Sequence, residues 1–226
     1  MAAAAMLLSN SSAKDPDNPT CPKDPDWGPS TPMKLTAVDR GGKRVLLAEG
    51  VVDALLPDRM YDAIAADDTI EEIWIRSRGG DAKAGNETGK VIREFAGIRT
   101  RIPNGWTCFS ACNFVFMGGE PRSVDPGGVF MVHMFTHTSQ RKVIEDSVEK
   151  GAEDTIELIG EIEQLSALLA SEDNAFLMRM GVMRSLLTDV MYRQLATGGK
   201  SGSGERYCLS LDEAIKYNVA QKERPD

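Results

Sequence analysis

The sequence lacks any apolar run that approaches the roughly 18–20 residues needed to cross a bilayer, although 42% of its 226 residues are hydrophobic. Its apolar start, residues 1–8, is short, has no basic flank and is followed by Ser-Asn-Ser-Ser. This start reads as a disordered tail, with the remnant of a trimmed signal or anchor as the alternative. We therefore expect a protein that does not span a membrane.

A block of basic residues is also missing. The chain carries 34 acidic residues against 26 lysines and arginines, which gives a net charge of −8. Binding to a nucleic acid backbone depends on clustered positive charge. The composition therefore excludes nucleic acid as an expected partner.

Histidine is scarce, and a phosphate-binding loop is absent. Only His133 and His137 occur, and no clustered cysteine or acid accompanies them, so the sequence predicts no metal site. The glycine-rich residues 198–204 lack the Walker spacing and follow no strand. We accordingly expect no cofactor.

Four cysteines are present, at Cys21, Cys108, Cys112 and Cys208. An even count permits three pairings in an oxidising compartment, and buried reduced thiols are the alternative. Cys108 and Cys112 would form a strained bridge inside a regular helix, but a feasible one if Cys108 precedes the first helical turn.

Strand and helix patterns alternate after an aperiodic, Pro- and Asp-rich lead-in over residues 1–34. We expect one domain over residues 35–226, with strands and helices in the order typical of parallel βαβ units. The strands are expected at 45–48, 70–75, 98–102, 122–124 and 129–132, and helices at 55–65 and 84–96, followed by an apolar segment at 108–117 that opens a further helix. Residues 140–196 form a long helical region whose apolar stripe, from Ile156 to Leu169, predicts docking on a neighbouring subunit.

Residues 108–112, Cys-Phe-Ser-Ala-Cys, place Ser110 at the start of a predicted helix. His133 follows at the end of a predicted strand, and Gly79 and Gly80 form a turn whose backbone amides are accessible to a substrate. A hydroxyl, an imidazole and exposed N–H groups are the components of acyl transfer. Cys108 and Cys112 bracket the serine, which leaves a thiol nucleophile as an alternative.

Several of these segments resemble the Clp protease proteolytic subunit and the wider crotonase-like superfamily. Residues 77–80 read Ser-Arg-Gly-Gly where the Clp peptidases have Ser-Pro-Gly-Gly, and Gly85 follows at the family interval. Ser110 takes the place of the family nucleophile, with Gly119 nine residues later. The chain is most similar to a group of exported bacterial proteins with a Cys-x-Ser-Ala-Cys motif.

The second half of the match contains the histidine. Arg122, Pro126 and the strand at 129–132 precede His133 in the family order, and residues 209–218 match the terminal Leu-Ser-x-x-Glu-Ala-x-x-Tyr-Gly motif, with Asn218 in place of its glycine. The resemblance covers about residues 45–219. It implies an α/β, Clp-like (crotonase-type) fold, with a twisted, largely parallel sheet wrapped by helices and a long helical arm.

The resemblance also implies roles for individual residues. Ser110 would be the nucleophile, His133 its base, and the N–H groups of Gly80 and Ala111 the oxyanion hole. The family aspartate has no counterpart, because Arg206 occupies its place. Glu205, Asp189 or no residue at all would then serve as the third catalytic member.

The predicted function is a serine hydrolase, a peptidase that acts on peptide or protein substrates as a homo-oligomer. Two alternatives stay open: a catalytically inactive, exported binding or scaffold protein, and a crotonase-like enzyme acting on acyl-CoA. The cysteines and the exported relatives favour a bacterial periplasmic location, with the cytoplasm as the alternative.

Overall fold

A five-stranded sheet forms the base of the molecule. The structure is a computed structural model, and it describes residues 13–133, 141–196 and 206–222. In the sheet, β3 and β4 form an antiparallel hairpin, and the other three neighbouring pairs are parallel. The strands, in their order across the sheet, are β3 (Lys34–Arg40), β4 (Lys43–Glu49), β5 (Ile70–Arg76), β6 (Arg99–Ile102) and β8 (Arg122–Val124).

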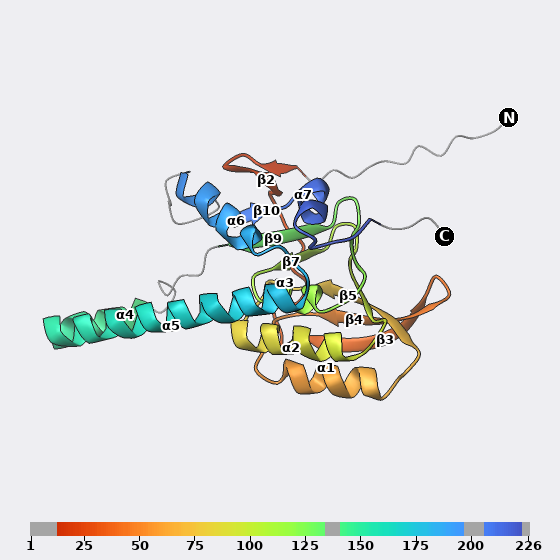
Figure 1. Cartoon of the computed structure of the whole chain (residues 1–226), viewed down its shortest axis with the longest axis horizontal. Coiled ribbons are helices and arrows are strands. Elements are labelled where there is room, and N and C mark those ends of the chain that lie inside the picture. Colours follow the sequence, from red (N-terminus) through yellow and green to blue (C-terminus); the bar gives the residue numbers. More distant parts are fainter. Residues whose placement is uncertain (1–12, 134–140, 197–205, 223–226) are drawn as a thin grey trace.

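Two helices connect the parallel strands. α1 (Leu56–Ala65) lies between β4 and β5 in the chain, and α2 (Ala82–Glu94) lies between β5 and β6. Both helices cover the same side of the main sheet (Figure 1). The α1 side chains at helical spacing, Leu56, Met60 and Ile64, are all buried, as an amphipathic helix packed on a sheet requires.

A second, three-stranded sheet lies on the other side of the main sheet (Figure 1). Its central strand β9 (Val129–His133) runs parallel to β7 (Thr107–Phe109) and antiparallel to β10 (Arg206–Cys208). The two sheets are joined after β5, where the Ser77 N–H donates to the Thr107 carbonyl and the Phe109 N–H donates to the Ser77 carbonyl, each at 3.0 Å. The predicted α/β class with a largely parallel sheet is confirmed.

The predicted helical region at 140–196 contains three helices. They are α4 (Arg141–Lys150), α5 (Ala152–Arg179) and α6 (Ser185–Ala196). Gly151 and Gly181 separate them, with φ values of 129° and 69° that glycine adopts readily. Phe176 and Leu177, near the end of α5, are buried in the core.

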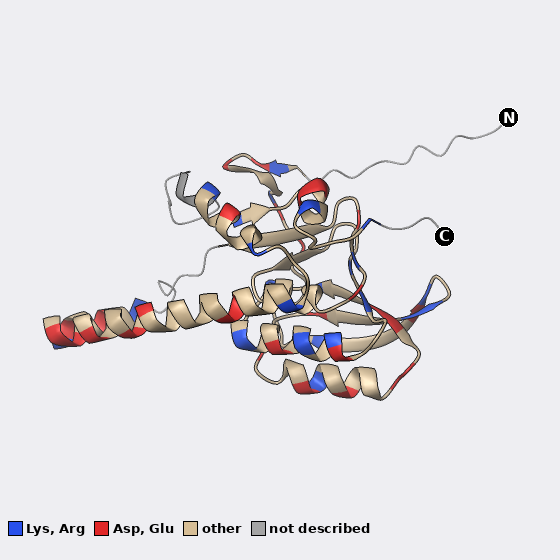
Figure 2. Cartoon of the chain, viewed as in Figure 1, with Lys and Arg blue, Asp and Glu red and all other residues tan. Residues whose placement is uncertain are grey.

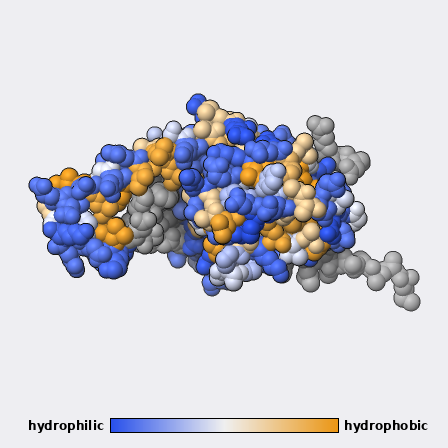
Figure 3. All heavy atoms as spheres, turned by 90° about the horizontal axis from the view of Figure 1, so that it is seen from below, coloured by the Kyte–Doolittle hydropathy of each residue, from blue (hydrophilic) through white to orange (hydrophobic). Residues whose placement is uncertain are grey.

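The first part of α5 and α4 form a projecting arm (Figure 1). Acidic and basic residues gather toward its free end (Figure 2), and apolar residues lie exposed along it (Figure 3). Ile156, Ile159, Leu165 and Leu168 are each at least half exposed. Contact of this arm with another subunit stays a prediction. None of the described helices has the length and apolar character to cross a membrane.

The predicted lead-in contains two short strands. β1 (Lys14–Asp15) pairs antiparallel with β2 (Asn18–Pro22), and a disulfide joins Cys21 of β2 to Cys208 of β10. β10 is followed by the short helix α7 (Leu211–Lys216). The division into a lead-in at 1–34 and a domain at 35–226 stays a prediction.

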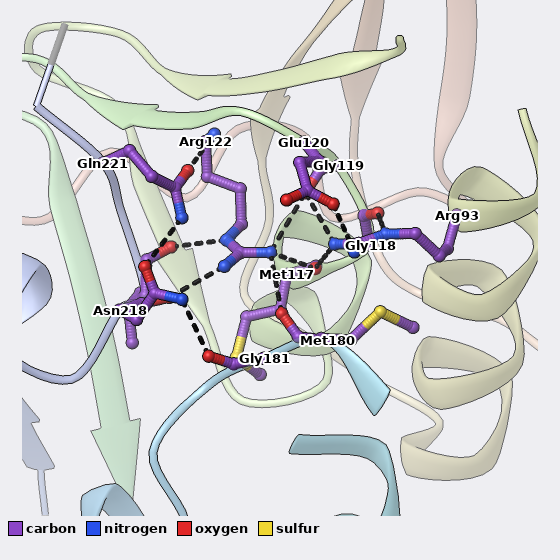
Figure 4. Close-up of polar contacts among 11 residues, drawn as sticks. Arg93, Met117, Gly118, Gly119, Glu120, Arg122, Met180, Gly181, Asn218 and Gln221 are labelled. Carbon is purple, nitrogen blue, oxygen red and sulfur yellow. Dashed lines mark hydrogen bonds and ion pairs between the residues drawn. The ribbon is translucent and has the colours of Figure 1, made fainter. Parts of the chain in front are cut away.

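Arg122, at the start of β8, is almost completely buried and has no carboxylate partner among the described residues. Its guanidinium donates to five backbone carbonyls instead (Figure 4). Burial lowers the pKa of Arg122 to about 10, the nearby Arg93 acts in the same direction, and Glu120 opposes it. The carbonyls belong to Met117, Gly119, Met180, Asn218 and Val219, so one side chain joins three separate segments of the chain.

Candidate active site

Ser110 lies on a sharp turn between β7 and the short helix α3 (Cys112–Met117). Its φ of 59° places a residue with a side chain in the left-handed region, a conformation that costs about 1–3 kcal/mol unless its surroundings enforce it. The side chain is half-buried. A strained turn that presents a hydroxyl at the end of a strand is typical of nucleophilic serines.

His133 ends β9, next to the strand that leads into this turn. The parallel pairing of β7 with β9 sets Phe109 opposite Met131. Ser110 follows Phe109 by one residue and His133 follows Met131 by two, so the serine and the imidazole lie at the same end of the two strands. The Ser110 Oγ lies 2.8 Å from the His133 Nε2. The Phe109 ring packs on the imidazole with 4.7 Å between ring centroids.

The Gly79–Gly80 turn lies directly against the Ser110 turn. A β-carbon placed on Gly79 would lie 2.6 Å from the Phe109 carbonyl oxygen and 2.7 Å from the Ser110 Cβ, so only glycine fits there. Gly80, with φ of 150°, would place a β-carbon 2.1 Å from the Val52 carbonyl oxygen. Both glycines are thus required by close backbone approach.

The N–H groups of Gly80 and Ala111 come from these two adjoining turns. The hydrogen bonds of the described residues leave both donors unused, whereas the Gly79 N–H donates to the Ser77 Oγ at 3.0 Å. Two unused N–H groups next to a serine hydroxyl suit an oxyanion.

A disulfide flanks the serine on both sides. Cys108 is in β7 and Cys112 is the first residue of α3, and their sulfurs are bonded. Cys108 therefore precedes the helix, as the i, i+4 bridge requires. Because neither residue has a free thiol, the thiol-nucleophile alternative is excluded.

The surroundings of the candidates for a third catalytic member are described only in part. Arg206 pairs directly opposite His133 in the antiparallel β9–β10 ladder. Asp189 accepts a hydrogen bond from the Tyr217 hydroxyl at 2.8 Å, while Glu205 lies outside the described residues. Asn18, from the lead-in, is buried and donates to the Arg206 carbonyl at 2.6 Å, a contact for which the sequence contains no signal.

A cavity of about 270 Å³ opens beside Ser110 and His133. Residues of α3, β9, α5 and α6 line it, and most of them are apolar. The side chains that form its walls include Phe114, Met117, Phe130, Leu169, Leu177 and Val190. Such a space beside a reactive pair is suited to a substrate side chain.

Two polar side chains in this cavity have oxygens without a hydrogen-bond donor. They are the Oδ1 atoms of Asp173, on α5, and Asn113, on α3, and both atoms are buried. Burial raises the pKa of Asp173 to about 6, Glu172 adds to the increase, and Asn86 opposes it. Sequence reasoning missed both residues, because nothing in their local pattern distinguishes them from other helical polar residues.

In the described part of the chain, no three His, Cys, Asp or Glu side chains are grouped so as to hold a metal ion. His137 lies outside the described residues.

Comparison with known proteins found similarity to solved structures only, because no family model and no curated protein matches the sequence. ClpP1 from Listeria monocytogenes is 16% identical over 80% of this chain and 92% of its own, with a TM-score of 0.48. A point mutant of the same ClpP1 is 17% identical over 78% and 88%, with a TM-score of 0.40. A mutant of the 1510-N membrane-bound stomatin-specific protease is 15% identical over 78% and 75%, with a TM-score of 0.43.

Proposed function

We propose that this protein is a serine hydrolase that cleaves peptide bonds through an acyl-enzyme. The observation that carries the proposal is the 2.8 Å contact between the Ser110 Oγ and the His133 Nε2. These atoms belong to residues far apart in the sequence, and the distance is that required for proton transfer between a nucleophile and its base.

In the proposed reaction, the Ser110 Oγ attacks the scissile carbonyl carbon and its proton passes to the His133 Nε2. The carbonyl oxygen becomes an oxyanion and accepts hydrogen bonds from the Gly80 and Ala111 N–H groups. His133 then gives the proton to the leaving amine as the C–N bond breaks. A water molecule hydrolyses the acyl-enzyme by the same steps, with His133 again as the base.

The strained backbone of Ser110 supports the same assignment. Its left-handed φ occurs between two bonded cysteines and next to Gly79, where a β-carbon would lie 2.7 Å from the Ser110 Cβ. A structural role for Ser110 gives no reason to maintain this conformation, whereas a nucleophile gains an exposed hydroxyl from it.

A catalytically inactive binding protein is the second candidate, and Arg206 is the observation that favours it. An arginine opposite His133 cannot accept the imidazole N–H. Removal of the orienting acid from a catalytic triad lowers turnover greatly. This candidate predicts a folded protein whose serine does not react.

The proposed setting is an oxidising compartment outside the cytoplasm. The two disulfides support this location, since such bonds persist mainly in exported proteins. Assembly into a homo-oligomer through the arm is part of the proposal and rests on its exposed apolar side chains.

Labelling with a fluorophosphonate probe tests the proposed function. We expect wild type to be labelled, Ser110→Ala to be unlabelled, and His133→Ala to react about 10²–10⁴ times more slowly because the base is lost. Ser171→Ala is the matched control, since Ser171 is exposed on α5 and does not line the cavity, and it should label as wild type does. Equal labelling of wild type and Ser110→Ala, or a folded wild type that does not react, contradicts the proposal.

A further inference from the structure

The cavity beside the reactive pair combines apolar walls with two buried oxygens that lack donors. An apolar cavity without polar atoms would accept an aliphatic side chain such as leucine. The Oδ1 atoms of Asp173 and Asn113 lack donors when the cavity is empty, and leucine would leave them so, whereas a ligand with a donor that reaches them would satisfy them. The walls therefore favour an apolar stem, and the oxygens favour a donor on the same ligand.

The Asn113 side chain is fixed in the orientation that makes its oxygen an acceptor. Its Nδ2 donates to the Met131 carbonyl at 2.7 Å, so the amide nitrogen is already used. The oxygen is buried and without a partner among the described residues. Any ligand group that reaches it has to be a hydrogen-bond donor.

Asp173 supplies the charge at this site. No other acidic residue lines the cavity in the described part of the chain, and His133 is the one basic group there. The groups that act on the carboxyl are Glu172 on the same helix and the neutral Asn86 amide on α2, while α3 and α6 contribute no charged lining residue. Burial raises the pKa of Asp173 to about 6, which leaves it ionised at neutral pH and able to take up a proton in mild acid.

We propose that this cavity receives the substrate side chain next to the cleaved bond and selects a basic one, lysine in particular. The four methylenes of lysine would lie along the apolar walls, and its ammonium would donate to Asp173 and Asn113. An ammonium has three donors and no acceptor, which matches oxygens that lack donors. The inference rests on the proposed function, because it assigns the substrate class of the same site.

The site should select lysine because a substrate side chain without a donor leaves the cavity oxygens without hydrogen bonds. A site built to hydrogen-bond a substrate group rejects an analogue without that group far more strongly than an apolar pocket rejects a smaller side chain. A charge-assisted bond to the carboxylate adds to this difference. We expect a preference for lysine over leucine of about 100-fold or more.

Paired activity probes test the selectivity. Two peptidyl diphenyl phosphonates that differ only in a lysine or leucine side chain at the reactive position are compared by their rates of reaction with Ser110. Wild type should prefer the lysine probe at pH 8, and the ratio of the two rates should fall at pH 5 as Asp173 is protonated. Asp173→Asn should bring the ratio near one at both pH values. Glu172→Gln, which does not line the cavity, should keep the wild-type preference at pH 8.

A binding measurement separates this inference from the hydrolase proposal. In an NMR titration, the Ser110→Ala protein should bind n-butylamine, the side chain of lysine, at least tenfold more tightly than 1-butanol. Adding Asp173→Asn should remove that difference. If the two ligands bind equally and the two probes react at equal rates, the inference is overturned. The hydrolase proposal still stands in that case if Ser110 is labelled. Selective amine binding without any labelling overturns the hydrolase alone and supports the basic-ligand site.

Discussion

Arg122 is a buried charged residue and Asp173 a half-buried one, and their surroundings differ. The Arg122 guanidinium donates to five carbonyls, and nothing in its environment has the character of a ligand site (Figure 4). Asp173 has a buried oxygen without a donor and lines a cavity beside a serine–histidine pair. A buried charge whose hydrogen bonds are made stabilises the fold, whereas a carboxylate with one oxygen left without a donor at a cavity points to a ligand.

The largest predicted effect on stability comes from replacing Arg122, whose hydrogen bonds are made. Arg122→Met should lower the free energy of unfolding by about 3–5 kcal/mol, because the carbonyls it holds lose their donors inside the core. Arg122→Lys keeps the charge but offers fewer donors in a different geometry, so its loss should be smaller. Urea unfolding followed by tryptophan fluorescence measures both. A loss below about 1 kcal/mol for Arg122→Met would show that the carbonyls find other donors.

Replacing Asp173 should stabilise the folded protein, whereas replacing Arg122 should destabilise it. The pKa of Asp173, about 6 in the folded protein, lies above the ordinary value of 3.8, so the folded state binds this proton more tightly than the unfolded state. Stability contributed by the proton is therefore present below about pH 4 and is lost as the pH rises through 6.

Asp173→Asn should consequently stabilise the protein at pH 8 and not at pH 4. We expect the free energy of unfolding to rise by about 1 kcal/mol at pH 8. The full shift of the pKa corresponds to about 3 kcal/mol, but water still screens part of the side chain. Unfolding at the two pH values measures the difference. An equal effect at both would mean that the ionisation of Asp173 is not responsible.

A charge at the surface gives the smallest effect. Burial opposes ionisation of Glu213, but Arg193, the Ser210 N–H and the Tyr207 hydroxyl hold its pKa at about 2. Its contribution is present above about pH 4.5 and is lost as the pH falls toward 2. Glu213→Gln should lower the free energy of unfolding by about 0.5–1 kcal/mol at pH 7, because solvent weakens such pairs. The measurement is the unfolding free energy of wild type and of Glu213→Gln at decreasing pH. The difference between the two proteins should fall to zero as the pH approaches 2.

The elements with strong local patterns were predictable from the sequence. The strand at 70–75 and the helix at 55–65 have apolar residues at the expected periods, and the structure has both within a residue or two. The strand β3 was missed, because its half-buried residues give no clear alternation and its stability comes from pairing with β4. The long helical region at 140–196 was predictable, but its division into three helices at Gly151 and Gly181 was not.

The site was predictable only where several residues pointed to one chemistry. Ser110, His133 and Gly80 have residue types whose spacing suggests acyl transfer, and the structure brings them together. Asp173 and Asn113 were not predictable, because their significance depends on which buried oxygens lack donors after the helices have packed. The partner of each cysteine likewise depends on distances in space rather than along the chain.

The Cys21–Cys208 bond has a mechanical consequence. It closes residues 21–208 into a covalent ring that contains β7, α3, β9 and the arm. Tension applied to the polypeptide on either side of the link, for example by a translocating motor, passes through the sulfur–sulfur bond instead of through Ser110 and His133. Stretching alone would therefore leave the serine–histidine pair assembled until that crosslink is reduced.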